Sequence, residues 1–222
     1  ITYSANNLTN KLYYRAVVKN GVCAATNSVS GDVSVDALSV GGAIGGSATV
    51  CTGTNSTTLT LSGQTGSITK WQSSTDAAFT SPSDIAHTAI TYSANNLTNK
   101  LYYRAVVKNG VCAAANSASG IVTVNLLPTA PTVTSPTICD GNTATILATA
   151  TPTGTYTYTW TVPTGVTAPG NVNTFTTTKA GTYSVTITNN DGCTSAGASG
   201  IVTVNLLPTA PTVTSPTICD GN

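Results

Sequence analysis

The chain contains no glutamate and few charges of either sign. Its seven acidic residues are all aspartate, lysine and arginine together number eight, and charged residues occupy 7% of the 222 positions, against about 25% in an ordinary soluble domain. The formal net charge is +1, so bulk electrostatics attract neither nucleic acid nor an anionic membrane. The polar surface must therefore be built from threonine, serine and asparagine.

Other absences exclude further classes of protein. No apolar run reaches the roughly 18 residues that a membrane-spanning helix needs. A single histidine and the lack of a Cys-x-x-Cys pair argue against a zinc site. Without glutamate or clustered aspartates, a pair of acid–base carboxylates is not expected. The sequence therefore predicts a protein that is not an enzyme and holds no cofactor or metal.

Two nearly identical repeats are present at different offsets. Residues 1–36 return at 90–125 with five substitutions, and residues 119–142 return unchanged at 199–222. Such copies indicate an array of domain-sized modules, in a window from a longer protein. The predicted domains are the C-terminal part of one module (1–36), two complete modules (37–125 and 126–205) and the N-terminal part of another (206–222).

The cysteines recur in register with these modules. Each complete module has one cysteine near its start and one near its end, so the sequence predicts one disulfide per module, which joins the first strand to the last hairpin. Disulfides persist in oxidising compartments, which indicates an extracellular protein. Closing a loop of about 60 residues would contribute roughly 4 kcal/mol in the chain-entropy model. The expected pairs are Cys51 with Cys112 and Cys139 with Cys193, while Cys23 and Cys219 would pair outside the window.

Alternating polar and apolar residues predict strands throughout. Within 101–108 and within 182–188 every second residue is apolar, as expected for strands with one buried face. Asn109-Gly110 and Asn190-Asp191-Gly192 follow these strands and are typical hairpin turns. Short strands separated by such turns predict an all-β chain of immunoglobulin-like antiparallel β-sandwiches in an extended string.

Four aromatic residues are predicted to lie in the cores of these sandwiches. Trp71 and Trp160 each follow the first cysteine of a module by about 20 residues, the arrangement of immunoglobulin-like domains. Tyr103 and Tyr183 lie on the inward face by alternation, and Tyr183 occupies a position that resembles a tyrosine corner.

Tyr156, Tyr158 and Trp160 share one strand face, for which two interpretations are open. An exposed row could stack on sugar rings, whereas a buried row would belong to the core, where aromatic side chains contribute most. The core is favoured, because the module has few other large apolar residues.

The remaining candidate residues have ordinary interpretations. His87 could pair with Asp84 and a serine for nucleophilic catalysis, but the next module has no equivalent histidine. Asp140-Gly141-Asn142 and its copy at 220–222 could suggest a calcium loop, but they lack further carboxylates and are interpreted as turns.

The two linkers differ in composition. Four glycines in 41–46 predict a flexible join between the first modules, whereas Leu-Leu-Pro-Thr-Ala-Pro at 126–131 and 206–211 predicts a stiffer, extended connection.

Two sequence patterns carry a family resemblance. The first, TICDGNTATILATATPTGTYTYTWTVPTG with AGTYSVTITNNDGCTS, resembles the immunoglobulin-like and PKD-like repeats of giant Bacteroidota surface adhesins. The second, KWQSSTDAAFTSP with LYYRAVVKNGVCAA, resembles a companion repeat type in the same proteins. The resemblance implies adhesins of gliding bacteria, exported by the type IX secretion system.

The predicted function is a structural one. The chain would form part of the stalk of an extracellular, cell-surface adhesin or filament, in which modules act as mechanical spacers. Its partners would be neighbouring modules and surface polysaccharide or other filament chains. The alternatives are accessory spacer or glycan-binding modules of a secreted polysaccharide hydrolase or peptidase, and a sheath polymer. The repeat number, the ligand, the tip domain and lateral assembly are not encoded in this sequence.

Overall fold

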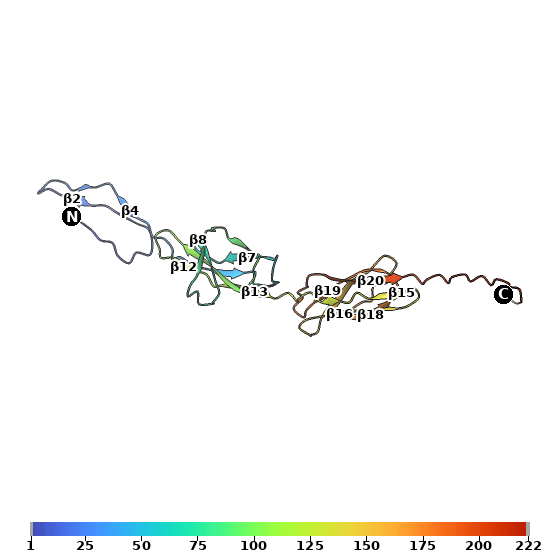
Figure 1. Cartoon of the computed structure of the whole chain (residues 1–222). Helices are drawn as coiled ribbons and strands as arrows, with labels where there is room; N and C mark the ends of the chain where they lie inside the picture. The colour runs from blue at the N-terminus through green and yellow to red at the C-terminus, as the bar shows by residue number, and fades with distance from the viewer. Residues whose placement is uncertain (1, 221–222) are drawn as a thin grey trace. The chain divides into compact units, whose positions relative to one another are not determined.

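The computed structural model describes residues 2–220, which form strands and loops (Figure 1). The chain divides into two compact units, Ile1–Val124 and Asn125–Asn222, and each is described by itself. Neither unit is a single sheet: in both, two sheets enclose an apolar core. The described chain is therefore all-β, as predicted.

The first unit contains one complete sandwich. One sheet has the order β10-β7-β5, and the other has the order β6-β13-β11-β8-β9, with the short β12 paired to β11. Strand β11 is central in the larger sheet and pairs antiparallel with β8, β12 and β13. These strands are β5 (Ala43–Gly45), β6 (Ala48–Cys51), β7 (Ser56–Ser62), β8 (Ser67–Ser74), β9 (Ser83–Ile85), β10 (Thr91–Asn95), β11 (Leu101–Lys108), β12 (Ala115–Asn116) and β13 (Gly120–Asn125).

The second unit repeats this arrangement with fewer strands. Its sheets have the orders β14-β16-β18 and β15-β20-β19-β17. The strands are β14 (Thr132–Val133), β15 (Thr137–Cys139), β16 (Ala144–Thr149), β17 (Thr157–Thr161), β18 (Thr174–Thr177), β19 (Gly181–Thr188) and β20 (Ala198–Asn205).

Residues 2–36 form only two small ladders. Strand β1 (Leu12–Tyr14) pairs with β4 (Gly31–Val33), and β2 (Val17–Val18) pairs with β3 (Thr26–Asn27). Most of their apolar side chains are exposed; Val17 and Val18, for example, retain 64% and 58% of their accessible surface. The nearly identical segment 90–125 is well packed, because β5 and β7 cover it and share its apolar core.

The predicted alternation is found in both long strands. In β11, Tyr103, Ala105 and Val107 are buried, and in β19 the same holds for Tyr183 and Val185. Leu59, Leu61 and Trp71 complete the centre of the first core, while Ile146 and Val202 do so in the second. Period-two burial thus decides which face of each sheet is apolar.

The glycine-rich segment 41–46 is not a flexible linker. Ile44 in β5 is buried, and β5 pairs with β7. A Cβ at Gly41 would collide with the backbone of Asn116, and one at Gly46, whose φ is +87°, would collide with the carbonyl of Thr58. These glycines allow the first strand to pass from one sheet to the other at close range.

The sandwich is not purely antiparallel. Strand β15 runs parallel to β20, with Thr137 opposite Thr203 and Cys139 opposite Asn205. In the first unit, an isolated parallel bridge joins Ala43 to Ala118. The first strand of each module therefore contributes a parallel edge that period-two alternation alone did not predict.

The predicted disulfides are wrong. Cys51 and Cys193 are each disulfide-bonded, but not to Cys112 or Cys139, so the structure does not have one disulfide per module. Cys112 and Cys139 are free thiols, so neither module is closed by a bridge of its own. The physical reason is that the two cysteines of a module lie at opposite ends of the sandwich. Cys139 lies opposite Asn205 at the end of β20, whereas the Cys112 Sγ lies 3.3 Å from the carbonyl of Ala37, near the start of its module. Cys23 and Cys219, whose partners were expected elsewhere, are also free and exposed.

Candidate functional surfaces

The core aromatic residues satisfy their polar atoms internally. The indole N–H of Trp71 donates to the carbonyl of Ala89 over 3.0 Å, and that of Trp160 donates to the carbonyl of Val172 over 2.8 Å. Because both indoles are buried, these bonds remove the cost of an unpaired donor. Both tryptophans therefore serve the core and are not available to a ligand.

Tyr183 forms a tyrosine-corner contact. Its hydroxyl donates to the carbonyl of Lys179 at 3.0 Å and lies 2.9 Å from the hydroxyl of Thr177. Tyr103, at the equivalent place in the first unit, instead packs against Tyr92 with ring centroids 5.6 Å apart. Burial, with the nearby Tyr92, raises the pKa of Tyr103 to about 12. Sequence alternation placed both rings in the core but could not distinguish their hydroxyl environments.

The aromatic row of the second unit is not an exposed platform. Trp160 is buried, and Tyr158 is half-buried against the core. Tyr156 is also half-buried, and its hydroxyl donates to the carbonyl of Pro152 over 3.1 Å. Stacking on sugar rings needs open aromatic faces, so this row favours the core interpretation.

His87 and Asp84 do not form a catalytic pair. The His87 Nε2 lies 2.6 Å from the carbonyl of Thr91, and its ring packs edge-on to Trp71 and Tyr92. Asp84 instead accepts from Lys70 over 2.7 Å. His87 thus covers one end of the first core.

A small ion network lies on the outer face of β8, β9 and β11. Asp84 accepts from the Lys70 ammonium and the Gln72 amide, each over 2.7 Å. These two hydrogen bonds, of which the one from Lys70 has the larger effect, hold the pKa of Asp84 below its ordinary value. The Gln72 carbonyl oxygen accepts from Arg104, whose guanidinium stacks 4.3 Å above the ring of Phe79. Every charge in this network has a partner, which leaves no free group for a substrate.

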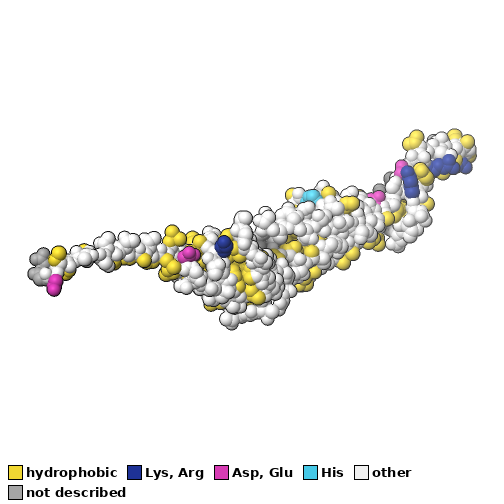
Figure 2. All heavy atoms as spheres, turned by 90° about the vertical axis from the view of Figure 1, so that its right-hand side faces the viewer, with side chains coloured by type: hydrophobic (Ala, Val, Ile, Leu, Met, Phe, Trp, Pro, Cys, Tyr) yellow, Lys and Arg dark blue, Asp and Glu magenta, His cyan; other side chains and the backbone are white. Residues whose placement is uncertain are grey.

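The outer face of the four-stranded sheet in the second unit is coated with hydroxyl groups. Thr157, Thr159 and Thr161 on β17 lie opposite Thr188, Thr186 and Ser184 on β19, and Ser184 bonds Ser199 on β20 over 2.7 Å. Figure 2 likewise shows a surface in which charged side chains are sparse. Such a face is polar and neutral, as the composition predicted.

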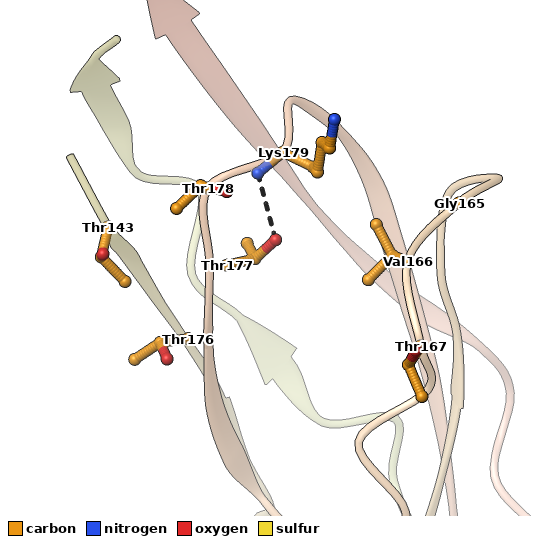
Figure 3. Close-up of a pocket in the computed structure, with 8 residues that line it drawn as sticks. All are labelled: Thr143, Gly165, Val166, Thr167, Thr176, Thr177, Thr178 and Lys179. Carbon is orange, nitrogen blue, oxygen red and sulfur yellow. Dashed lines mark hydrogen bonds between the residues drawn. The ribbon is translucent and has the colours of Figure 1, made fainter. Parts of the chain in front are cut away.

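One shallow hollow of about 390 Å³ lies in the second unit (Figure 3). Thr143 and Thr176–Thr178 line one side of it, and Val166 and Thr167 line the other. The Thr177 hydroxyl accepts from the backbone N–H of Lys179 over 3.2 Å. The hollow has one cation, Lys179, at its rim, and its other lining residues are uncharged.

Within residues 2–220, no cluster of three potential metal ligands is present. In this described part of the chain, every buried side-chain nitrogen or oxygen atom has a hydrogen-bond partner. A buried polar atom without a hydrogen-bond partner in the protein can mark a place where a ligand, ion or water binds. Asp140 and Gly141 lie in a turn; of the copy at 220–222, Gly221 and Asn222 lie outside the described residues. Among the described residues, no helix has the length and apolar character of a membrane span.

The N-terminal end of each module is held by its last hairpin. In the first unit, Asn109 donates through its side chain to the carbonyl of Ala37 over 2.8 Å and through its backbone to the hydroxyl of Ser39 over 2.9 Å. The carboxylate of Asp36 accepts from the N–H of Val111 over 3.1 Å. In the second unit, Asn189 bonds the carbonyl of Leu126 over 3.3 Å.

The opposite end is held by Asn55, which sequence reasoning missed. Its side-chain amide donates to the carbonyls of Cys51 and Leu97 over 2.7 and 2.8 Å, and its side-chain oxygen accepts from the N–H of Leu97 over 2.8 Å. These long-range bonds fix the loop between β10 and β11.

A family described as "Domain of unknown function (DUF8696)" matches residues 1–37 and 40–126, which is more than half of the chain. The chain belongs to this family. No curated protein matches it.

Solved structures with similar folds are tandem or single β-sandwiches. They include the titin I-band fragment I67–I69 (14% identity, 88% of this chain and 75% of that one, TM-score 0.44) and fibronectin(III)-like modules of CbhA from Clostridium thermocellum (14%, 76% and 95%, TM-score 0.31). A third is the PKD domain of human KIAA0319 (19%, 40% and 91%, TM-score 0.30). The β-sandwich architecture of this chain is shown by its own strands, which form two facing sheets around each apolar core.

Proposed function

We propose that this chain is a section of the stalk of an extracellular, cell-surface adhesin, in which each module is a mechanical spacer. The resemblance of its repeats to Bacteroidota gliding adhesins makes surface adhesion, gliding and type IX export parts of the same proposal. Neighbouring modules, surface polysaccharide and other filament chains are the proposed partners. No enzymatic step is assigned to this segment.

The observation that carries the proposal is the pairing of the first and last strands. In the second unit, β15 lies parallel to β20, and the N–H of Thr203 donates to the carbonyl of Pro136 over 3.1 Å, while that of Asp140 donates to the carbonyl of Asn205 over 2.8 Å. In the first unit, β6 is likewise the neighbour of β13.

This arrangement opposes tension along the chain. The segment before β15 enters the module at one end, and the segment after β20 leaves at the other, so a pull on both segments slides the two strands past each other. The bonds between parallel strands are then loaded together and not opened one after another. A module with this pairing resists extension without any disulfide of its own.

Neutral threonine-rich surfaces also suit a stalk. Side chains without charge neither repel copies of the same chain nor attract ionic ligands. The alternative of glycan-binding accessory modules loses its main support, because Trp160 and Tyr158 pack in the core and Tyr156 is half-buried.

The test is single-molecule force spectroscopy of the chain, pulled from its ends. Thr203→Pro removes the N–H that bonds Pro136 and should clearly lower the unfolding force of the second unit, whereas the matched Thr203→Val keeps this N–H and should leave the force near that of the parent chain. Equal forces for the two variants, or no force peak in the parent chain, would refute the mechanical role.

Localisation requires a separate measurement. Immunogold electron microscopy of intact cells, with an antibody against one module, should label projections from the cell surface. Label confined to the medium, together with hydrolytic activity, would instead support the accessory-module alternative.

A further inference from the structure

Two hairpins of the chain share the heptapeptide Lys-Asn-Gly-Val-Cys-Ala-Ala, at 19–25 and at 108–114. Asparagine followed by glycine is especially prone to deamidation, because glycine has no side chain to hinder attack by its own backbone nitrogen on the asparagine side chain. The local chemistry is therefore the same at Asn20 and at Asn109. Any difference in their reactivity must come from the structure around them.

Asn109 is held at the N-terminal end of its module. Its side-chain amide donates to the carbonyl of Ala37 over 2.8 Å, and its backbone N–H donates to the Ser39 hydroxyl over 2.9 Å. The next residue, Gly110, lies so close to Asp36 that an added Cβ would collide with the carboxylate. Asn109 is consequently half-buried, and we call residues 36–39, which cover it, the entry segment.

Asn20 has none of these restraints. It is exposed, and among residues 2–220 its hydrogen-bond partner is the backbone N–H of Cys23, which bonds its main-chain carbonyl and not its side chain. An added Cβ at Gly21 would meet nothing within 4 Å. The chain thus contains one open copy and one held copy of the same reactive dipeptide.

We propose that Asn109 is a deamidation site whose reaction is gated by opening of the entry segment. Cyclisation requires the Asn109 side chain to turn from the Ala37 carbonyl onto the backbone nitrogen of Gly110, and both hydrogen bonds of Asn109 oppose this movement. Withdrawal of the entry segment from the hairpin removes the two bonds together. Deamidation then proceeds as freely as it does at Asn20.

The reaction needs no oxidant or cofactor. The Gly110 nitrogen loses its proton and bonds to the side-chain carbonyl carbon of Asn109, ammonia leaves, and a cyclic imide forms. Water then opens the imide to aspartate or isoaspartate. The new carboxylate has no proton to donate to the Ala37 carbonyl, and it adds a second negative charge to the hairpin that Asp36 contacts. The modification therefore keeps an opened entry segment from closing again.

The second unit holds its own start with a less reactive dipeptide. Asn189 donates to the carbonyl of Leu126 over 3.3 Å, but Asn190, and not a glycine, follows it. The side-chain oxygen of Asn189 also accepts from two backbone N–H groups of its hairpin. Asn189 therefore serves as an internal reference that should stay unmodified. The proposal concerns the covalent state of a hairpin and stands independently of adhesion.

Peptide mapping of the full chain, incubated at mildly alkaline pH, measures both sites. Trypsin with chymotrypsin releases residues 20–38 and 109–126, and mass spectrometry follows the conversion of amide to acid, corrected for an unincubated sample. Asn20 should react at the rate of a synthetic peptide of residues 19–25. Asn109 should react about tenfold more slowly or less, as two hydrogen bonds of ordinary strength would give. Equal rates at Asn20 and Asn109 overturn the proposal.

Two serine variants decide whether the gate is local. Ser39→Ala removes the acceptor of the Asn109 N–H and should speed deamidation of Asn109 several-fold, up to roughly tenfold. The control Ser47→Ala removes a similar bond of 3.0 Å, from the N–H of Ile121 near the start of β11, and should leave the rate unchanged. Equal acceleration by both variants would mean that the whole module unfolds first. That result, or no acceleration by Ser39→Ala, refutes the gate.

The product is tested with Asn109→Asp. Hydrogen exchange at the amides of residues 109 and 111, which bond Ser39 and Asp36 in the parent chain, should become about tenfold faster. The matched variant Asn20→Asp should leave the exchange of both amides unchanged. Exchange in Asn109→Asp as slow as in the parent chain would show that the aspartate still holds the entry segment, which contradicts the proposed effect of the modification.

Discussion

At the scale of single residues, three of the four core aromatic residues combine apolar burial with a hydrogen-bonded polar atom. Trp71 and Trp160 bond backbone carbonyls, and Tyr183 bonds the carbonyl of Lys179 and the hydroxyl of Thr177. Tyr103 is buried beside Tyr92. The large side chains of these small cores thus also fix the loops that their polar atoms contact.

Loss of the Tyr183 hydroxyl should destabilise the second unit. Tyr183→Phe removes two hydrogen bonds and leaves the buried Thr177 hydroxyl with fewer partners, so the free energy of unfolding should fall by about 1 to 3 kcal/mol. Urea unfolding measures this change. The control Tyr156→Phe removes only a partly exposed bond to Pro152 and should cost less than about 0.5 kcal/mol; equal losses for the two variants would contradict the tyrosine-corner role.

Tyr103 should make the first unit sensitive to alkali. Its pKa in the folded state is about 12, against about 10 in an unfolded chain, so its contribution is complete below pH 10 and is lost as the pH rises from 10 toward 12. Tyr103→Phe should therefore reduce the loss of stability over this range. The measurement is urea unfolding at several pH values, followed by Trp71 fluorescence in a Trp160→Phe background. If the free energy of unfolding falls equally with pH in the parent chain and in Tyr103→Phe, the prediction is wrong.

At the scale of elements, glycine occupies the positions of the last strand where the first strand packs closest to it. Gly120 in β13 faces Ile44 so closely that a Cβ would lie 2.6 Å from the Ile44 Cγ2, and Gly200 in β20 lies as closely against Val133 and Thr134. Both glycines occur in the same Ser-Gly-Ile-Val sequence. The first strand can pack over the last one only because these positions lack a side chain.

The repeats supply a matched pair of glycines for a test. Gly120→Ala should overpack the first unit and lower its free energy of unfolding by about 1 to 3 kcal/mol. Gly31 occupies the equivalent place in residues 2–36, where nothing lies within 4 Å of an added Cβ, so Gly31→Ala should leave thermal unfolding of the unit nearly unchanged. A Gly120→Ala chain as stable as the parent would show that Ile44 can move aside at little cost.

At the scale of the whole molecule, neither complete module is closed by a disulfide of its own. Each sandwich instead relies on its apolar core and on hydrogen bonds that fasten its two ends, such as those of Asn55 and Asn109. A chain of such modules needs no oxidant to fold each one.

Removal of the free thiols tests this independence. Cys112→Ser and Cys139→Ser should each change the free energy of unfolding by no more than about 0.5 kcal/mol, as ordinary surface substitutions do. If a bridge closed either module, the loss would be roughly 4 kcal/mol. Calorimetry under oxidising conditions distinguishes the two outcomes.

The sequence by itself determined the fold class, the module repeat, the buried face of β11 and β19 and the neutral threonine surface, because these depend on local alternation and composition. It did not determine which cysteines pair. The recurrence of one cysteine near the start and one near the end of each module suggested bridges within modules, but pairing depends on which end of the sandwich each strand reaches.

Only the tertiary structure decided the remaining features. The glycines of 41–46 predicted a flexible join, but they lie at and beside β5, which pairs with β7. The bonds of Asn55 to Leu97, 42 residues away, were not predicted at all. Long-range contacts of this kind arise when two sheets face each other, and no local pattern in the chain records them.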